Sequence, residues 1–310
     1  MFSRKRSYIT LLSMLFLLVW MAGCGCRSSR TNTDAIQNAG SDTMVNLAQA
    51  WAEEYADVDS TVSIEVSGGG SGTGIAALIN GTVDLANSSR KLKPEEAKKV
   101  VEHTGLNAIE FIVGYDALAV YVHKDNPLNE ITISQLAEIY AEGGAIEKWS
   151  QLGVDNASCS SDKIIRVSRQ SNSGTYFYFR EAILGTDHDF KLGSRDLHGS
   201  KDVVELIAHT PCAIGYSGLG YDTPEVKKLA IGQNADGPFV PPTAETTLSG
   251  AYPIARPLYM YSLGKPNEAM KRYLRWIFSA EGQKIVAETG YIPLREEQRL
   301  EMLTRLEDNN

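Results

Sequence analysis

The sequence predicts an α/β fold with mostly parallel sheets, because strand-like and helix-like segments alternate along most of the chain. The chain has 310 residues, of which 43% are hydrophobic and 22% are charged. This composition is typical of a folded globular protein and argues against a fibrous or disordered one. At about 150 residues per domain, the length predicts about two lobes.

The first half of the folded region contains short apolar segments that end in polar or glycine-rich turns. The expected strands are 34–40, 61–66 and 83–86, and the expected helices are 43–55, 74–79 and a segment that starts at Pro94. Residues 109–122 are largely apolar and too long for one typical strand. We therefore expect two strand segments there, which meet near Gly114.

The second half repeats this alternation. The expected strands are 164–168, 213–216 and a returning strand at 252–261; the expected helices are 134–140, 174–184, 268–278 and 280–288. Ser134 is the expected cap of the first of these helices. Residues 233–253 are rich in Gly, Pro and Thr and are expected to form a loop.

The N-terminus carries the pattern of an export signal. Three cationic residues at positions 4–6 precede an uncharged run at 8–25, whose apolar core is too short for a typical spanning helix. The small residues Ala22 and Gly23 precede Cys24, as in a bacterial lipobox, although Met21 stands where leucine is usual. We expect cleavage before Cys24 and lipidation of its thiol, with an uncleaved anchor or plain secretion as alternatives.

Charge and cysteine content exclude several functions. The formal net charge is -8, which argues against a nucleic-acid binder because such a protein needs a basic face. Cys159 and Cys212 could pair in an oxidising compartment, but their spacing alone does not decide this.

The sequence shows no pattern typical of a metal site or a catalytic site. No HExxH motif or other metal-ligand spacing occurs, and no nucleophile–base pair is apparent. We therefore expect no metal, no cofactor and no enzymatic activity.

Three polar turns, each leading into an expected helix, carry the chemistry. They span residues 40–43, 67–74 and 169–175 and are rich in Ser, Thr and Gly. The first N–H groups of a helix lack internal partners and lie at the positive end of its dipole. Each turn could therefore cradle an oxyanion. Taken singly, each turn could equally be an ordinary helix cap.

In combination, these turns resemble those of the phosphate-binding lipoproteins of bacterial Pst-type ABC transporters, a family of periplasmic-type binding proteins. The most specific motif, Arg-x-x-x-Ser-Gly-Thr, is met by residues 169–175; the family's binding serine after a glycine run falls on Ser71, and its first loop falls on 40–43. The resemblance covers about residues 35–295.

The resemblance implies two α/β lobes that are joined by two crossover strands, at 109–122 and 254–262, with an anion cleft between them. The implied organisation is a signal peptide (1–23), a lipidated tether (24–34), lobe I (35–113), lobe II (114–257) and a return to lobe I with C-terminal helices (258–310). The implied phosphate ligands are Ser41, Asp42, Thr43, Ser71, Gly72, Ser89, Arg90, Arg169, Ser173, Gly174 and Thr175.

The function implied is that of an extracytoplasmic, membrane-anchored lipoprotein, expected to be a monomer. It would capture inorganic phosphate and deliver it to the transmembrane subunits of an ABC permease. Two alternatives stay open: a binding protein for sulfate, molybdate or tungstate, and a lipoprotein that senses or scavenges phosphate without a permease.

One position departs from the family's pattern. The family often places an acid after the strand at 83–86, where it accepts the proton of hydrogen phosphate, and here Ser89 stands in its place. We hypothesise that Asp42 is the replacement acceptor, its alternative role being a helix cap. Arg90 would either bind the anion or balance Asp42; its alternative is a solvated charge beside Lys91 and Lys93.

Overall fold

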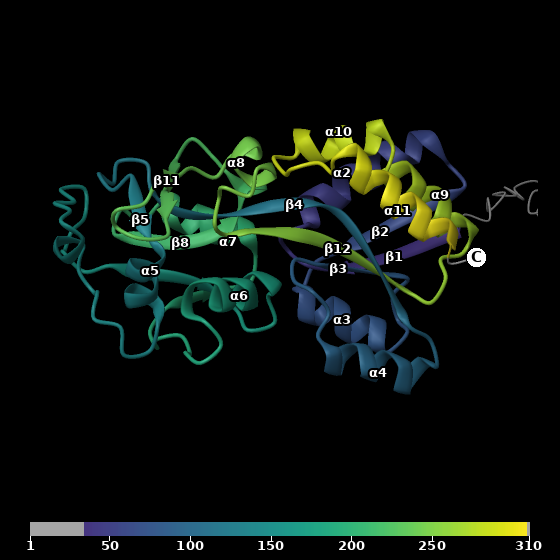
Figure 1. Cartoon of the computed structure of the whole chain (residues 1–310), viewed down its shortest axis with the longest axis horizontal. Coiled ribbons are helices and arrows are strands. Elements are labelled where there is room, and N and C mark those ends of the chain that lie inside the picture. Colours follow the sequence, from purple (N-terminus) through teal and green to yellow (C-terminus); the bar gives the residue numbers. More distant parts are fainter. Residues whose placement is uncertain (1–33, 309–310) are drawn as a thin grey trace, which may run out of the picture. The chain divides into compact units, whose positions relative to one another are not determined.

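The computed structural model describes residues 34–308, and its main sheet runs through two lobes (Figure 1). The strand order is β2-β1-β3-β12-β4-β8-β6-β7, with β9 paired to β4. Neighbouring strands within each lobe are parallel, as β1 is to β2 and β3 and β6 is to β7 and β8. The pairs that involve the long strands β4 and β12 are antiparallel. The predicted α/β fold is confirmed, but the expectation of mostly parallel sheets is wrong, because antiparallel strand pairs are as numerous as parallel ones between residues 34 and 308.

Lobe I combines the start of the described chain with its end. Its strands are β1 (Asp34–Gly40), β2 (Val62–Ser67) and β3 (Leu85–Ser88); its helices are α2 (Val45–Val58), α3 (Ser71–Ile79), α4 (Pro94–Thr104), α9 (Glu268–Ile277), α10 (Ala280–Glu288) and α11 (Glu296–Asp308). In Figure 1, α3 and α4 lie on the opposite face of these strands from α2, α9 and α10.

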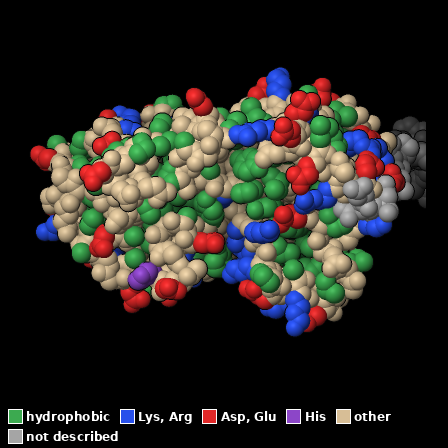
Figure 2. Space-filling view, in the orientation of Figure 1, with side chains coloured by type: hydrophobic (Ala, Val, Ile, Leu, Met, Phe, Trp, Pro, Cys, Tyr) green, Lys and Arg blue, Asp and Glu red, His purple; other side chains and the backbone are tan. Residues whose placement is uncertain are grey.

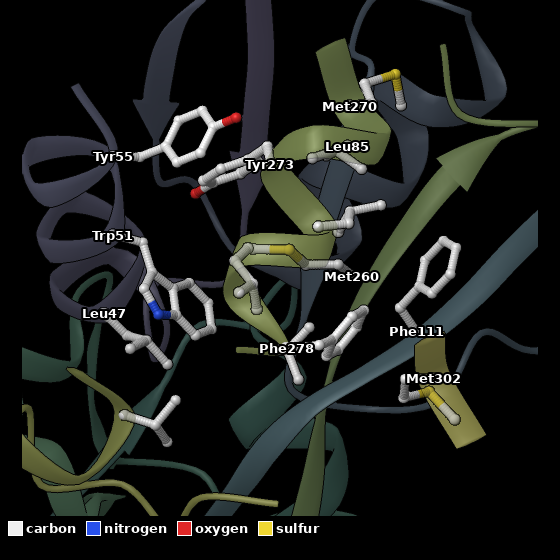
Figure 3. Packing of buried hydrophobic residues seen from close by; sticks show 14 of the residues in the cluster. Leu47, Trp51, Tyr55, Leu85, Phe111, Met260, Met270, Tyr273, Phe278 and Met302 are labelled. Carbon is white, nitrogen blue, oxygen red and sulfur yellow. The ribbon is translucent and has the colours of Figure 1, made fainter. Parts of the chain in front are cut away.

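The larger core of lobe I lies under α2 and α9 (Figure 3). Trp51 and Tyr55 of α2 are almost completely buried there, next to Tyr273 and Phe278. The rings of Tyr55 and Tyr273 have centroids 5.0 Å apart, a distance typical of favourable aromatic pairs. This core packs the C-terminal helices against the N-terminal strands, so lobe I contains both ends of the described chain.

Two long strands connect the lobes. β4 (Ala108–His123) pairs with β12 (Ala255–Leu263) in lobe I and with β8 in lobe II. The expectation of two segments that meet near Gly114 is wrong, because one continuous strand serves both lobes. The irregularity is a register shift opposite Leu258 and Tyr259, where Leu258 faces Gly114 and Tyr259 faces Ile112. The bulge therefore lies beside the glycine without ending the strand.

Lobe II holds the middle of the chain. Its strands are β5 (Glu130–Thr132), β6 (Ile165–Arg169), β7 (Arg195–Leu197), β8 (Ala213–Gly218), β9 (Val226–Lys228), β10 (Ala230–Gly232) and β11 (Phe239–Val240); its α-helices are α5 (Ile133–Tyr140), α6 (Gly174–Phe179), α7 (Ser200–Ala208) and α8 (Ala244–Leu248). Phe179 stacks on Tyr216 with ring centroids 3.7 Å apart, so α6 is held against β8 directly behind the third polar turn.

Several local predictions need correction. The helix predicted from Gly74 begins at Ser71, because Gly70 takes a positive φ of 92° that completes the preceding turn. Thr132, not Ser134, caps α5: its hydroxyl accepts a bond from the Gln135 N–H at 3.1 Å. The helix predicted at 174–184 is α-helical only to Phe179 and continues as a π turn. Residues 233–253 also include β11 and α8.

Cys159 and Cys212 form a disulfide within lobe II, which settles the open question of their pairing. The predicted signal peptide, most of the tether (24–34) and the lipidation site Cys24 lie outside the described residues. Within residues 34–308, no helix has the length and apolar character needed to span a bilayer. The predicted lobe boundaries at 113 and 257 stay predictions, since β4 and β12 run through both lobes.

Candidate functional site

The three predicted polar turns meet between the lobes in one cluster of hydroxyl groups. Ser41 donates to Ser89 Oγ at 3.0 Å, and Ser71 Oγ lies 3.3 Å from Ser89 Oγ. Across the lobes, the hydroxyl groups of Thr43 and Thr175 are 2.7 Å apart. All five side chains are almost completely buried. We call Ser41, Thr43, Ser71, Ser89 and Thr175 the interlobe hydroxyl cluster.

The sheet of lobe I positions half of this cluster. β1 and β3 are parallel neighbours with Gly40 opposite Asn87, so Ser41 and Ser89 leave the carboxyl ends of adjacent strands, where α/β sheets bind their ligands. Gly40 has a φ of 141°, and a Cβ there would lie 2.2 Å from the carbonyl oxygen of Asn87. A glycine is therefore required for the first turn to approach β3 closely.

The third turn brings lobe II against the cluster through Gly174. A Cβ at Gly174 would lie 2.2 Å from Ser71 Oγ and 2.7 Å from Ser89 Oγ. Ser173, one residue earlier, caps α6, because its hydroxyl accepts a bond from the Thr175 N–H at 3.1 Å. The N–H of Gly72 donates to the carbonyl of Asn172 at 2.9 Å. Ser173 and Gly72 thus have structural roles in this arrangement as well as places beside the cluster.

Asp42 and Arg169 form a buried ion pair that links the first and third turns. Arg169 Nη2 lies 3.0 Å from Asp42 Oδ2, and the N–H of Gly69 donates to Asp42 Oδ1 at 2.8 Å. The carboxylate of Asp42, in the first turn, therefore receives bonds from both the second and the third turn. Such charge-assisted bonds are stronger and more directional than neutral ones.

The remaining bonds of Arg169 fix its guanidinium group. Nε and Nη2 donate to the carbonyl of His198, and Nη1 donates to Ser200 Oγ at 2.7 Å. The second N–H of Nη1 has no partner among residues 34–308. Burial lowers the pKa of Arg169, while the Asp42 carboxylate acts in the opposite direction. The side chain stays cationic, because the intrinsic pKa of guanidinium is above about 12.

A second buried ion pair, between Arg256 of β12 and Asp116 of β4, was missed in the sequence. Arg256 Nη2 lies 2.8 Å from Asp116 Oδ2 and also donates to Thr175 Oγ1 at 3.0 Å. Burial raises the pKa of Asp116, an effect that Arg256 and the Leu219 N–H oppose. The available signal was an acid in the middle of one apolar crossover segment and the single base of the other.

Arg90 does not balance Asp42, and this half of its prediction is wrong. Its guanidinium forms two bonds with Glu96, of 2.8 and 2.6 Å, while Asp42 is paired with Arg169. The reason lies in the chain direction after Ser89, since the loop turns toward the start of α4. Burial would raise the pKa of Glu96, but the bonds from Arg90 and from the Lys93 N–H outweigh it and lower that pKa. Arg90 as an anion ligand stays a prediction.

Metal chemistry finds no support in the described part of the chain. Between residues 34 and 308, no three His, Cys, Asp or Glu side chains form a group that could hold a metal ion. What the site offers instead is a set of hydroxyl and guanidinium donors with one carboxylate acceptor, Asp42, at its edge. This set of donors suits a small oxyanion.

Comparisons with known proteins agree with this chemistry. Residues 27–281 match the family model described as a PBP superfamily domain. The phosphate-binding protein PstS of Pseudomonas aeruginosa is 35% identical over 269 residues, which cover 84% of this chain and 83% of the relative. The phosphate-binding protein PstS of Bacillus subtilis is 30% identical over 308 residues, covering 94% and 95%.

Solved structures give the same picture. A putative phosphate ABC transporter substrate-binding protein from Clostridium perfringens, solved with bound phosphate, superposes with a TM-score of 0.75 at 28% identity, covering 84% of this chain and 100% of that one. An ABC-type phosphate transport receptor from Vibrio cholerae superposes with a TM-score of 0.65 at 26% identity, covering 84% and 100%.

Proposed function

The chain belongs to the PBP superfamily and, within it, to the PstS family of phosphate-binding proteins, and from this premise we propose that it captures inorganic phosphate outside the cytoplasm and delivers it to an ABC permease. The observation that carries the proposal is the interlobe hydroxyl cluster, in which three turns remote in sequence meet beside two arginines. The family is one of transport binding proteins rather than enzymes.

The anion would be held by hydrogen-bond donors more than by net charge. Arg169 and Arg256 each have a carboxylate partner, Asp42 and Asp116, so the two ion pairs are together neutral. The donors proposed for phosphate are the hydroxyls of the interlobe hydroxyl cluster, the N–H group of Gly174 and Arg169. Ser173 supports the third turn, and Gly72 supports the second turn through its bond to the carbonyl of Asn172. Directional donors select the tetrahedral shape of the ligand.

We propose that Asp42 is the acceptor for the proton of hydrogen phosphate, in place of the acid that Ser89 replaces. Its side chain is 10% exposed and lies at the edge of the cluster. A fully ionised anion such as sulfate has no proton to donate, so its oxygens would face the carboxylate oxygens of Asp42 with no hydrogen bond between them, which is costly. Asp42 would thereby make the site selective for phosphate.

The test is calorimetric titration of the purified protein, freed of phosphate and kept in mild detergent, with phosphate, sulfate and molybdate between pH 5 and 8. Phosphate should bind at least about 100-fold more tightly than sulfate, a difference of about 2.7 kcal/mol. If sulfate or molybdate bound as tightly as phosphate, the assigned ligand would be tetrahedral oxyanions in general and not phosphate in particular. In the Asp42→Asn variant, the ratio of the phosphate affinity to the sulfate affinity should fall. An unchanged ratio would mean that another group accepts the proton.

We further propose that the protein is a monomeric lipoprotein anchored through Cys24. The disulfide between Cys159 and Cys212 supports an oxidising, extracytoplasmic location. Acyl chains on the Cys24 thiol would keep the binding lobes near the permease. Cell fractionation tests the anchor: the wild-type chain should sediment with membranes, and the Cys24→Ala variant should either lose this association or remain uncleaved.

A further inference from the structure

A basic pocket opens at the seam between the lobes, outside the interlobe hydroxyl cluster. Its volume is about 380 Å³, and the residues that line it include Arg90, Lys91 and Lys93 from lobe I and Phe177 and Arg180 from lobe II. In Figure 2, Lys and Arg atoms gather beside the notch at the lower edge of the view, between the parts that carry α4 and α6 in Figure 1. The concentration of cations is unusual in a chain with a net charge of -8.

The walls of this pocket continue directly from the proposed phosphate site. In lobe I, Arg90 follows Ser89 in the chain, and in lobe II, Phe177 lies two residues after Thr175. Ser89 and Thr175 are completely buried, so an anion reaches them only when the lobes separate. The pocket therefore lies on a short route between solvent and the hydroxyl cluster.

The cations of the pocket differ in how far they are neutralised. Arg90 is paired with Glu96, and Arg180 lies 2.7 Å from Asp189. Lys91 and Lys93, by contrast, form no ion pair within residues 34–308. Arg90 is only 8% exposed, and its Nε has no hydrogen-bond partner in that part of the chain. The pocket thus offers two ammonium groups without a salt bridge in that part of the chain, and one unpaired buried donor.

The same cations contact lobe II in this closed arrangement. Lys93 Nζ lies 4.3 Å from the centroid of the Phe177 ring, and Arg90 Cζ lies 5.3 Å from it. Both distances are within the range of cation–π attraction. When the lobes separate, these contacts are lost and the lysine ammonium groups face the opening. An incoming anion then takes the place of the ring as their partner.

We propose that this pocket is an anion vestibule, which collects phosphate on the open protein and passes it to the buried site. The inference rests on the proposed function and adds a second, weaker oxyanion site to it. Four cations line the pocket against one acid, Glu181. A cleft in which charge of one sign predominates raises the local concentration of the opposite ion and the association rate, by about 10-fold to 1,000-fold in favourable cases. Salt screens this effect over about 10 Å at 0.1 M.

The test compares association rates by stopped-flow protein fluorescence, with inorganic phosphate as the ligand, at low and high ionic strength. The Lys91→Gln/Lys93→Gln variant should associate about threefold to tenfold more slowly than wild type at low salt, and the difference should shrink at high salt. The matched control is Lys98→Gln/Lys99→Gln, which removes two charges from exposed positions further along α4.

The control should associate at the wild-type rate. An unchanged rate in the Lys91→Gln/Lys93→Gln variant, or an equal fall in both double variants, would overturn the vestibule. The dissociation rate is measured separately and is not used to test the vestibule, because Lys93 also contacts Phe177 in the closed form and its loss could change that rate. If the wild-type protein bound no phosphate at all in calorimetry, the proposed function would fail instead, so the two failures are distinguishable.

Discussion

Arg256 and Asp116 face each other across the two crossover strands, with 2.8 Å between Nη2 and Oδ2 and almost no exposure of either side chain. Their strands pair in register at this point, so the ion pair joins the two connections between the lobes. Arg256 also donates to the carbonyl of Ser89 at 3.1 Å and to Thr175 Oγ1. One cation thus contacts both lobes at the proposed anion site.

Asp116→Ala should lower the free energy of unfolding by about 3–5 kcal/mol, because it leaves Arg256 buried without its partner. The double variant Asp116→Leu/Arg256→Met should recover much of this loss, since it removes both charges from the interior. Urea denaturation of the three proteins measures both effects. Equal losses in the single and double variants would mean that packing, not charge pairing, dominates at this position.

Gly174→Ala should lower phosphate affinity by about 10–100-fold while it changes the free energy of unfolding by less than about 2 kcal/mol. The added Cβ would lie 2.2 Å from Ser71 Oγ and 2.7 Å from Ser89 Oγ, so the lobes cannot close fully around the anion. Calorimetry measures the affinity. Gly237→Ala is the control, because its Cβ would make only ordinary contacts, the nearest at 3.6 Å; wild-type affinity in Gly174→Ala would contradict the closure geometry.

The sequence pattern was sufficient for the alternation of the main strands and helices, but it missed α7, α8, α11 and the short strands β5, β7, β9, β10 and β11. The meeting of the three turns was implied by the family resemblance, since each turn alone could be a helix cap. Turn residues such as Ser41 and Ser71 could be identified because hydroxyls before a helix are a local signal. Arg256 and Asp116 could not, because their pairing depends on the register between strands about 140 residues apart. The pairing of Arg90 with Glu96 was also missed. Glu96 lies at the start of α4, where its carboxylate also accepts a bond from the Lys93 N–H.

Replacing Cys159 and Cys212 together by Ala should lower the free energy of unfolding by about 4 kcal/mol, as loop-closure entropy gives for a disulfide that spans 53 residues. The pair holds the segment before β6 to the start of β8, remote from the hydroxyl cluster. Phosphate affinity should therefore stay within about threefold of wild type. Thermal or urea denaturation gives the first quantity and calorimetry the second; a stability equal to wild type would show that the bond constrains little in the unfolded chain.

Glu96→Gln should reduce stability at pH 7 by about 1–2 kcal/mol, the value of a hydrogen-bonded charge that is 18% exposed. In the folded state, the bonds from Arg90 and from the Lys93 N–H lower the pKa of Glu96 below its ordinary value of 4.5. Its contribution is thus complete above about pH 4.5 and is lost as the pH falls through the lower, folded-state value. Urea denaturation between pH 7 and pH 3 should show that the difference in free energy of unfolding between the variant and wild type becomes smaller below about pH 4.5. A stability difference that stays constant with pH would exclude the ionisation of Glu96 as its cause.

Arg169→Lys should lower phosphate affinity at least about 100-fold, although the substitution keeps the positive charge. The guanidinium donates at once to Asp42, Ser200 and the carbonyl of His198, and the proposed function adds the anion to these partners. A lysine ammonium has three donors and no planar fork, so it cannot satisfy these partners and the ligand together.

Arg272→Lys is the matched control, because Arg272 forms a half-exposed ion pair with Asp59 away from the site. Its phosphate affinity should stay within about twofold of wild type in calorimetry. If Arg169→Lys also bound phosphate at wild-type strength, charge alone would be sufficient at this position and the directional role of the guanidinium would be lost. If both variants weakened binding equally, the effect would come from general destabilisation, because Arg169 pairs with Asp42 at the site whereas Arg272 pairs with Asp59 away from it.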